Sequence, residues 1–120
     1  MGFVAIFIAS CYYDNFEEVY PGAGLTNTCD TAGTMTYNLN AKKIFDENCG
    51  TSQSGCHSAN SSSGYNLSDY AGSVATANTG LLLGSIRHEN GYSAMPKNLP
   101  KMNDCNIVVI EKWVSQGLLQ

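Results

Sequence analysis

Apolar residues recur at four-residue steps just before the middle of the chain. Tyr37, Ala41 and Phe45 fall on one side of a helix at this spacing. Asn38 can cap the start of this helix, and the pattern ends near Asn48. The pattern therefore predicts a helix of about ten residues.

The clearest helical pattern lies near the C-terminus. Ile107 and Ile110 fall on one side of it, and Asn103 or Asp104 can cap its start. Gly117 is a natural stop, because glycine adopts the left-handed conformation that ends many helices. We therefore expect a terminal helix between these residues.

Two shorter helices are expected between these two. The segment LSDYAGSVATA predicts a helix capped by Ser68, and GLLLGSIRH predicts another capped near Asn78 or Thr79, although glycine interrupts both. SANSSSGYN has the composition of a loop, and ENGYSAMPKNLPK contains two prolines and a glycine and cannot form a regular element. No alternating strand pattern competes, so we expect an all-α domain over residues 37–120.

The composition limits both the core and the partners. The chain has 120 residues, which favours one domain, and only 13% of them are charged. A domain of about 85 to 90 residues with this much loop would bury a small core, which a large apolar cofactor would enlarge. The net charge is −4, without a basic run or stripe, which argues against nucleic acid as a partner.

The N-terminal residues indicate export. Residues 1–10, MGFVAIFIAS, are too few to cross a bilayer, which needs roughly 20 apolar residues, but they match the apolar part of a signal peptide. The last of them and the next residue, Ile8-Ala9-Ser10-Cys11, resemble the lipobox of bacterial lipoproteins, which implies a lipid on Cys11. The positively charged segment that usually opens a signal peptide is missing, which leaves open whether Met1 is the natural start.

Residues 11–36 have no sustained period and indicate a lipidated N-terminus followed by a tether. We therefore expect a periplasmic or cell-envelope protein that a lipid anchors to a membrane. In such an oxidising compartment, disulfides persist.

The stretch NCGTSQSGCH, residues 48–57, carries the candidate chemistry. It ends with Cys56 followed directly by His57, as a haem-attachment site does, but six residues separate Cys49 from Cys56 where the usual C-x-x-C-H motif has two. Three interpretations are open at this point. They are a stretched covalent haem site, a small-loop disulfide, and a zinc site that also uses His88.

The order of the chemistry-bearing residues resembles that of class I cytochromes c. A helix leads to Cys49, then Cys56 and His57 follow, then short helices, then Met95 in a loop that contains proline, and then the terminal helix. In that family two cysteines bind one haem through thioethers, and a histidine and a methionine are the axial iron ligands. The resemblance implies an all-α fold of three to four helices with long loops around one haem c.

The C-terminal stretch SAMPKNLPKMNDCNIVVIEKWVSQG is similar to the ending of many small exported cytochrome domains, and the similarity covers most of the chain from Cys11 onward. It implies that Cys49 and Cys56 attach the haem covalently. It also implies that His57 and Met95 ligate the iron.

Three other residues compete with Met95 as the second ligand. Met35 precedes the first helix, and Met102 stands where the resembling sequences carry an aliphatic residue, so both are expected to pack in the core. His88 is the main alternative. Ligation by two histidines would lower the reduction potential. We favour Met95 and expect His88 to form a hydrogen bond near the edge of the haem.

The six-residue spacer is where this chain departs from the family. Closing a loop of six residues rather than two costs about 1 kcal/mol more, which a covalent bond tolerates. Whether Cys49 is bonded stays open, because a single thioether through Cys56 would still place His57.

The resemblance also implies a partner for each remaining cysteine. The first and last helices of class I cytochromes pack together, which would make Cys29 and Cys105 neighbours and allow a disulfide between them. Such a bond would close a loop of about 75 residues and contribute around 4 kcal/mol in the chain-entropy model.

The expected function is that of a membrane-anchored monohaem cytochrome c that carries single electrons. It is not expected to be an enzyme, because iron with two protein ligands has no open site. Its partners would be redox proteins, or the other subunits of a membrane respiratory complex. Two other classes stay open: a five-coordinate haem enzyme or sensor, and a haem-free, disulfide-stapled interaction domain of a lipoprotein.

Overall fold

Helices account for all the regular structure in the part of the chain that the computed structural model describes, residues 29–52 and 55–120. The expected signal peptide and the lipidation site at Cys11 lie outside these residues. The helical elements are a π-helical turn, η1 (Tyr37–Ala41), and the α-helices α2 (Lys42–Asn48), α3 (Tyr70–Asn78), α4 (Leu81–Ile86) and α5 (Asp104–Ser115). The expected all-α class is therefore confirmed for the described residues.

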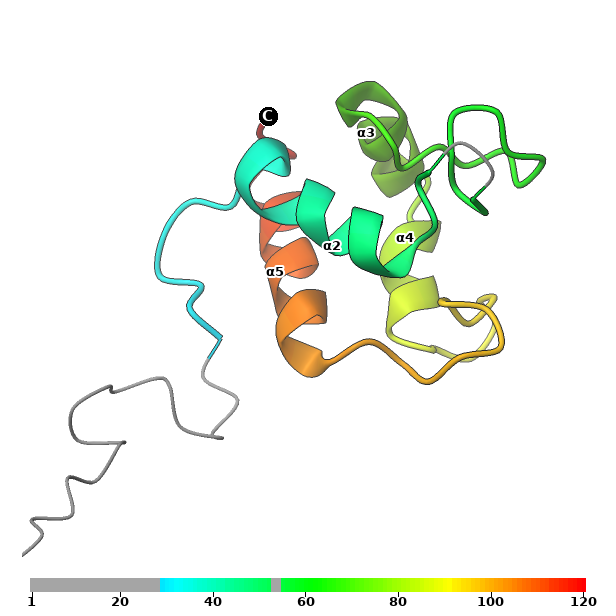
Figure 1. Ribbon diagram of the computed structural model, residues 1–120. Helices are drawn as coiled ribbons and strands as arrows, with labels where there is room; N and C mark the ends of the chain where they lie inside the picture. The colour runs from blue at the N-terminus through cyan, green and yellow to red at the C-terminus, as the bar shows by residue number, and fades with distance from the viewer. Residues whose placement is uncertain (1–28, 53–54) are drawn as a thin grey trace, which may run out of the picture.

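The first predicted helix is present as η1 followed directly by α2 (Figure 1). Its cap is Thr36 rather than Asn38, because the Thr36 backbone is extended and its hydroxyl accepts a hydrogen bond from the Leu39 amide at 3.3 Å. Asn38 already lies inside the helix. The buried side of η1 and α2 is the predicted one, with Ala41 and Phe45 fully buried.

The terminal helix α5 also matches the expectation. The Asn103 side chain caps it by accepting a hydrogen bond from the Asn106 amide at 2.8 Å, and Gly117 has the left-handed backbone (φ +97°) of a helix stop. Its buried side packs against the first helix, where the Trp113 ring meets the Phe45 ring edge-on with centroids 6.0 Å apart.

The caps of the two short helices differ from the predicted ones. Asp69, not Ser68, caps α3, and its carboxylate accepts a hydrogen bond from the Gly72 amide at 2.7 Å. α4 has no side-chain cap, because Gly80 turns the chain in a left-handed conformation (φ +78°) directly before it. Asn78 ends α3 and Thr79 follows as its C-terminal cap, so neither starts α4.

The last residues fold back over the core and connect its parts. The Leu119 carbonyl accepts hydrogen bonds from the Tyr37 amide at 2.7 Å and from the Trp113 indole at 2.8 Å. The Leu118 carbonyl accepts one from the Tyr70 hydroxyl at 2.8 Å. The C-terminus therefore lies beside the start of the first helix, as Figure 1 shows.

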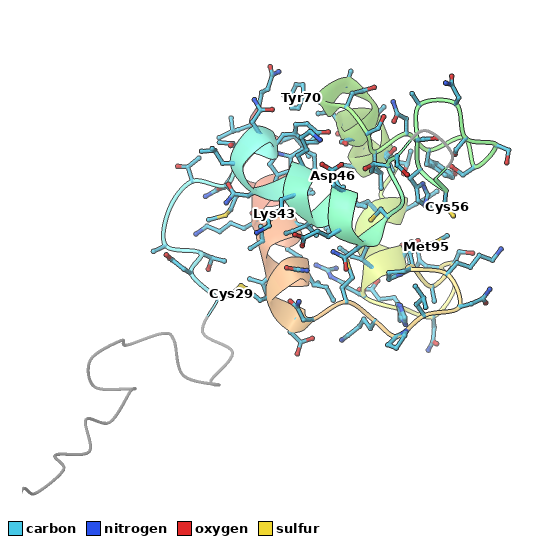
Figure 2. The ribbon with its side chains drawn as sticks, viewed as in Figure 1. Cys29, Lys43, Asp46, Cys56, Tyr70 and Met95 are labelled. Atoms are coloured by element: carbon cyan, nitrogen blue, oxygen red, sulfur yellow. A yellow bond between two sulfur atoms is a disulfide. The ribbon has the colours of Figure 1, made fainter. Side chains whose placement is uncertain are left out.

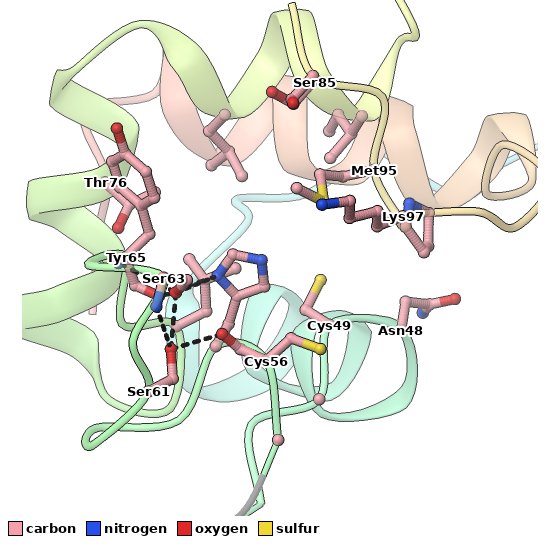
Figure 3. A pocket seen from close by; sticks show the side chains of 18 of the residues that line it. Asn48, Cys49, Cys56, Ser61, Ser63, Tyr65, Thr76, Ser85, Met95 and Lys97 are labelled. Atoms are coloured by element: carbon pink, nitrogen blue, oxygen red, sulfur yellow. Dashed lines mark hydrogen bonds between the residues drawn. The ribbon is translucent and has the colours of Figure 1, made fainter.

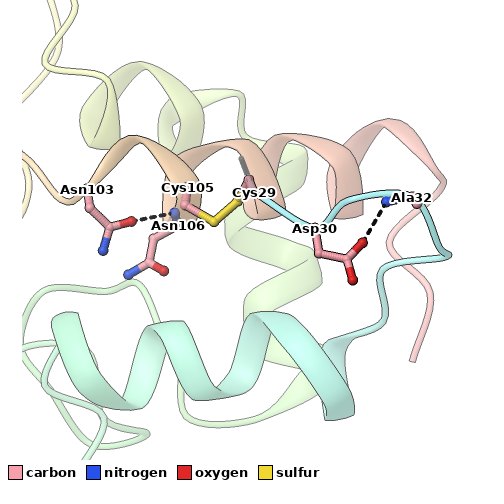
Figure 4. The surroundings of a disulfide bond; sticks show 6 residues. All are labelled: Cys29, Asp30, Ala32, Asn103, Cys105 and Asn106. Atoms are coloured by element: carbon pink, nitrogen blue, oxygen red, sulfur yellow. Dashed lines mark hydrogen bonds between the residues drawn. A yellow bond between two sulfur atoms is a disulfide. The ribbon is translucent and has the colours of Figure 1, made fainter. Parts of the chain in front are cut away.

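A disulfide joins Cys29, ahead of η1, to Cys105 in the first turn of α5 (Figure 4). The two Cα atoms are 5.1 Å apart, within the usual range for a disulfide. Figure 2 shows Cys29 on one side of the molecule and Cys56 and Met95 on the other. Within the described residues, no helix is long and apolar enough to cross a membrane.

Candidate cofactor site

A cavity of about 1110 Å³ opens beside the core, between the end of α2, the loop that follows Cys56, α4 and the loop around Met95 (Figure 3). Cofactor pockets usually measure roughly 300–1,000 Å³, so a large planar group would fit. Four of the residues that line the cavity are the predicted haem residues: Cys49, Cys56, His57 and Met95.

The backbone around His57 fixes the orientation of its ring. Its Nδ1 lies 2.9 Å from the Tyr65 carbonyl oxygen, which can only accept a hydrogen bond, so Nδ1 carries the proton. Nε2 is then the nitrogen with a free lone pair, the form in which imidazole binds a metal. The His57 carbonyl accepts a hydrogen bond from the Leu67 amide at 2.9 Å, which holds both ends of this loop together.

Serine hydroxyls extend this hydrogen-bond network. Ser61 donates to the Cys56 carbonyl, and its oxygen lies 2.6 Å from that of Ser63. The Ser63 hydroxyl in turn donates to the Tyr65 carbonyl at 3.3 Å (Figure 3). The loop that follows His57 is therefore ordered by side chain–backbone bonds rather than by regular structure.

Met95 reaches the cavity from the opposite side to Cys49 and Cys56 (Figure 3). Its amide donates a hydrogen bond to the Ser85 carbonyl at 3.0 Å, which fixes the loop to α4, and the peptide bond to Pro96 is cis.

The competing ligands lie elsewhere. His88 does not line the cavity, and its Nε2–H donates a hydrogen bond to the Met95 carbonyl at 3.0 Å. Met35 and Met102 are buried in the core, each 5% exposed. Of the four candidates for a second axial ligand, the structure brings only Met95 to the cavity.

Cys49 and Cys56 are free thiols rather than a disulfide. Burial, together with the nearby Asp46 carboxylate, raises the pKa of the Cys49 thiol to about 12. The zinc interpretation needs a group of at least three His, Cys, Asp or Glu side chains that could hold a metal ion. Residues 29–52 and 55–120 contain no such group.

The base of the cavity is apolar, whereas polar side chains also line its rim. Leu67, Leu82 and Ile86 are buried at the base, and four large apolar side chains of the lining are exposed: Tyr65, Leu81, Tyr92 and Leu99. Apolar side chains around an open cavity are costly unless something covers them. A planar apolar cofactor with two vinyl groups for the thiols and an iron for the imidazole and thioether suits this lining.

Two contributions to the site could not be seen in the sequence. One is the Tyr65 carbonyl, because a backbone carbonyl leaves no mark on residue type. The other is Gly84, where a Cβ would collide with the Tyr92 ring. The glycine that weakened the prediction of α4 is therefore the residue that lets Tyr92 pack against that helix.

Comparisons with known proteins leave the function to be inferred from these residues and their placement: no protein-family model matches the chain, and no curated protein and no solved structure is detectably similar to it.

Proposed function

We propose that the chain is a monohaem c-type cytochrome that carries single electrons. Cys49 and Cys56 would bind the haem through thioethers, and His57 and Met95 would be the axial ligands. The observation that carries this proposal is that these four residues, spread over the sequence from 49 to 95, line one cavity of cofactor size with an apolar base.

The arrangement of the helices supports a class I cytochrome c-like fold. In that arrangement the helix ahead of the first haem cysteine packs against the terminal helix, and here α5 packs against η1, which continues into α2. Met95, which would bind the iron, lies in the loop between α4 and α5. The proposed fold also agrees with the order of the site residues along the chain.

The protein residues would bind, orient and enclose the cofactor. His57 presents Nε2 because the Tyr65 carbonyl holds its other nitrogen. The Met95 thioether favours ferrous iron and so raises the reduction potential. A bound haem would supply a one-electron couple, and two protein ligands leave no open position for a substrate.

The proposal extends to the cell envelope. A lipid on Cys11 would anchor the domain to a membrane, and the residues between Cys11 and Cys29 would let it move between redox partners or hold it in a respiratory complex. From Cys29 onward the chain belongs to the domain, because Cys29 is bonded to Cys105 and Met35 is buried in the core. The Cys29–Cys105 disulfide supports export, since structural disulfides persist in oxidising compartments.

The test is to produce the full chain in a bacterium that attaches haem to exported proteins, and to determine the mass of the proteolytic peptide that contains residues 49–57. We expect an increase by one haem, and a reduced spectrum with a sharp α band. A His57→Ala variant should lose the six-coordinate spectrum. An unmodified peptide would instead support a haem-free interaction domain, and a high-spin spectrum would support a haem enzyme or sensor.

A further inference from the structure

The spacer between Cys49 and Cys56 is closed at its two ends by a pair of glycines. A Cβ on Gly55 would overlap the Gly50 carbonyl, and a Cβ on Gly50 would lie only 3.0 Å from the Cys56 amide nitrogen. Gly50 also has a left-handed backbone, with φ +62°. Both positions therefore require glycine, Gly55 for space alone and Gly50 for space and conformation.

The two glycines are almost as close as consecutive residues. Their Cα atoms lie within about 4.4 Å of each other, because a Cβ on Gly55 would be 2.9 Å from the Gly50 Cα and a carbon–carbon bond is about 1.5 Å long. Consecutive Cα atoms are about 3.8 Å apart. The chain thus leaves its path at Gly50 and returns to nearly the same place at Gly55.

The hydrogen bonding across this junction is that of a short turn. The His57 amide donates to the Gly50 carbonyl at 3.0 Å. If residues 51–54 are left out of the count, this bond runs from residue i+3 back to residue i, the bond that closes a β-turn or one turn of a tight helix. The same pattern continues at Ser58, whose amide donates to the Gly55 carbonyl at 3.5 Å.

The chain leaves this junction away from the cavity. Gly50 and Gly55 line the cavity, but Thr51 does not. The Thr51 hydroxyl donates instead to the carboxylate of Asp46, which Lys42 also contacts at 2.6 Å on the surface of α2.

We infer, on the basis of the proposed function, that this motif is a C-x-x-C-H motif with a four-residue insertion at residues 51–54. Gly50 and Gly55 are its two intervening residues, and Gly55 is a positioning residue that holds Cys49 in place relative to Cys56 and His57. Deleting residues 51–54 would leave Cys-Gly-Gly-Cys-His. The deletion removes the insertion without moving either sulfur far.

The test compares three variants with the wild type, all as full chains matured in the same haem-attaching bacterium. They are a deletion of residues 51–54, Gly55→Ala, and Gly33→Ala as the control, because Gly33 has open space around it and no left-handed backbone. The readout is the fraction of chains with two thioethers. It is measured by mass spectrometry after unfolding and alkylation of any thiol at Cys49 that remains unbonded.

We expect the deletion variant and Gly33→Ala to reach the wild-type fraction of doubly attached chains. Gly55→Ala should lower that fraction at least fivefold and leave Cys49 alkylated, because the added methyl group pushes the two ends of the insertion apart. Far-ultraviolet circular dichroism tests whether each variant is as helical as the wild type.

The outcomes separate this inference from the proposed function. If the wild-type chain carries no haem, both the inference and the proposed function are overturned. Three other outcomes overturn the inference alone and leave the proposed electron carrier intact. They are a single thioether in the wild type, a deletion variant that attaches no haem, and a Gly55→Ala variant with the wild-type number of thioethers. The deletion tests the inference even if Gly55→Ala fails to fold.

Discussion

Cys49 and Cys56, the two cysteines of the proposed haem site, have different surroundings. Cys56 is exposed, whereas Cys49 is partly buried at the end of α2, and burial together with the Asp46 carboxylate raises the pKa of its thiol to about 12. Alkylating reagents react with the thiolate, so a raised pKa lowers the reactive fraction at every pH below it. The two cysteines should therefore react at very different rates in a chain that has not received haem.

We expect iodoacetamide at pH 8 to modify Cys56 in the unmodified full-length chain on the order of 10² to 10³ times faster than Cys49. The rate at Cys49 should rise with pH up to about 12, and a variant Asp46→Asn should react somewhat faster because a negative charge is removed. Peptide mass spectrometry with fragmentation assigns the modified cysteine. Equal rates at the two positions in the folded chain would contradict the burial of Cys49.

The choice between Met95 and His88 as second axial ligand can be tested by replacing each of them. In the haem-loaded protein, Met95→Leu should remove the weak far-red band and lower the midpoint potential, because the thioether that favours ferrous iron is lost. His88→Asn should keep the band, and asparagine tolerates the left-handed backbone at this position (φ +57°). Absorption spectra and a redox titration of both variants provide the measurement, and the reverse pattern would identify His88 as the ligand.

At the level of single residues, the side chains of the candidate site could be predicted from the sequence, but the backbone groups that position them could not. Cys49, Cys56, His57 and Met95 could be found because their chemistry is distinctive and their order along the chain is informative. The carbonyl of Tyr65 could not, because every residue has one and only the folded loop directs it at an imidazole. The contact between Gly50 and Gly55 could not be predicted for a similar reason, since a close approach of two backbones depends on the path of the loop between them.

Among the helices, the sequence predicted which segments are helical but not where most of them begin. The buried sides follow from the apolar spacing, because that spacing decides which face can pack. The starts depend on local competition between several residues that can all cap a helix. Thr36 prevails over Asn38 because its hydroxyl accepts from Leu39 while the Asn40 side chain accepts from the Thr36 amide at 2.9 Å, so the two bonds support each other.

The cap of α5 gives a test of helix stability. Asn103→Ala should lower the free energy of unfolding by about 1 kcal/mol, because the Asn106 amide loses the side-chain oxygen that accepts its hydrogen bond. Asn106→Ala is the matched control, since only the backbone of Asn106 takes part in the cap and alanine favours helix. Urea denaturation of the two variants measures the difference. Equal midpoints would show that Asn103 does not cap the helix.

In the whole molecule, the bonds that hold the two ends of the domain together lie away from the cavity, although the core itself forms the base of the cavity. Three such sets of contacts involve no residue that lines the cavity. They are the disulfide, the aromatic packing between α5 and the first helix, and the hydrogen bonds of the last residues to Tyr37, Tyr70 and Trp113. A change in the disulfide should therefore alter the stability of the domain and leave the geometry of the site intact.

Removal of the disulfide tests this separation. Replacing Cys29 and Cys105 together by serine should lower the free energy of unfolding by about 4 kcal/mol, because the unfolded chain is then no longer closed into a loop of this length. The sequence separation of the two cysteines, 76 residues, sets that magnitude. Urea denaturation of the full chain measures the loss, and the rate of alkylation at Cys56 reports whether the site has changed.

The single substitutions test whether the covalent bond between Cys29 and Cys105 accounts for this loss of stability. If Cys29 and Cys105 are bonded, either Cys29→Ser or Cys105→Ser alone should destabilise the protein as much as the double substitution, because breaking the cross-link from one end already opens the loop. A reductant should then have no further effect on any of the three variants but should bring the wild type down to their level. If the two single substitutions instead have small effects that add up in the double variant, the two side chains contribute to stability independently.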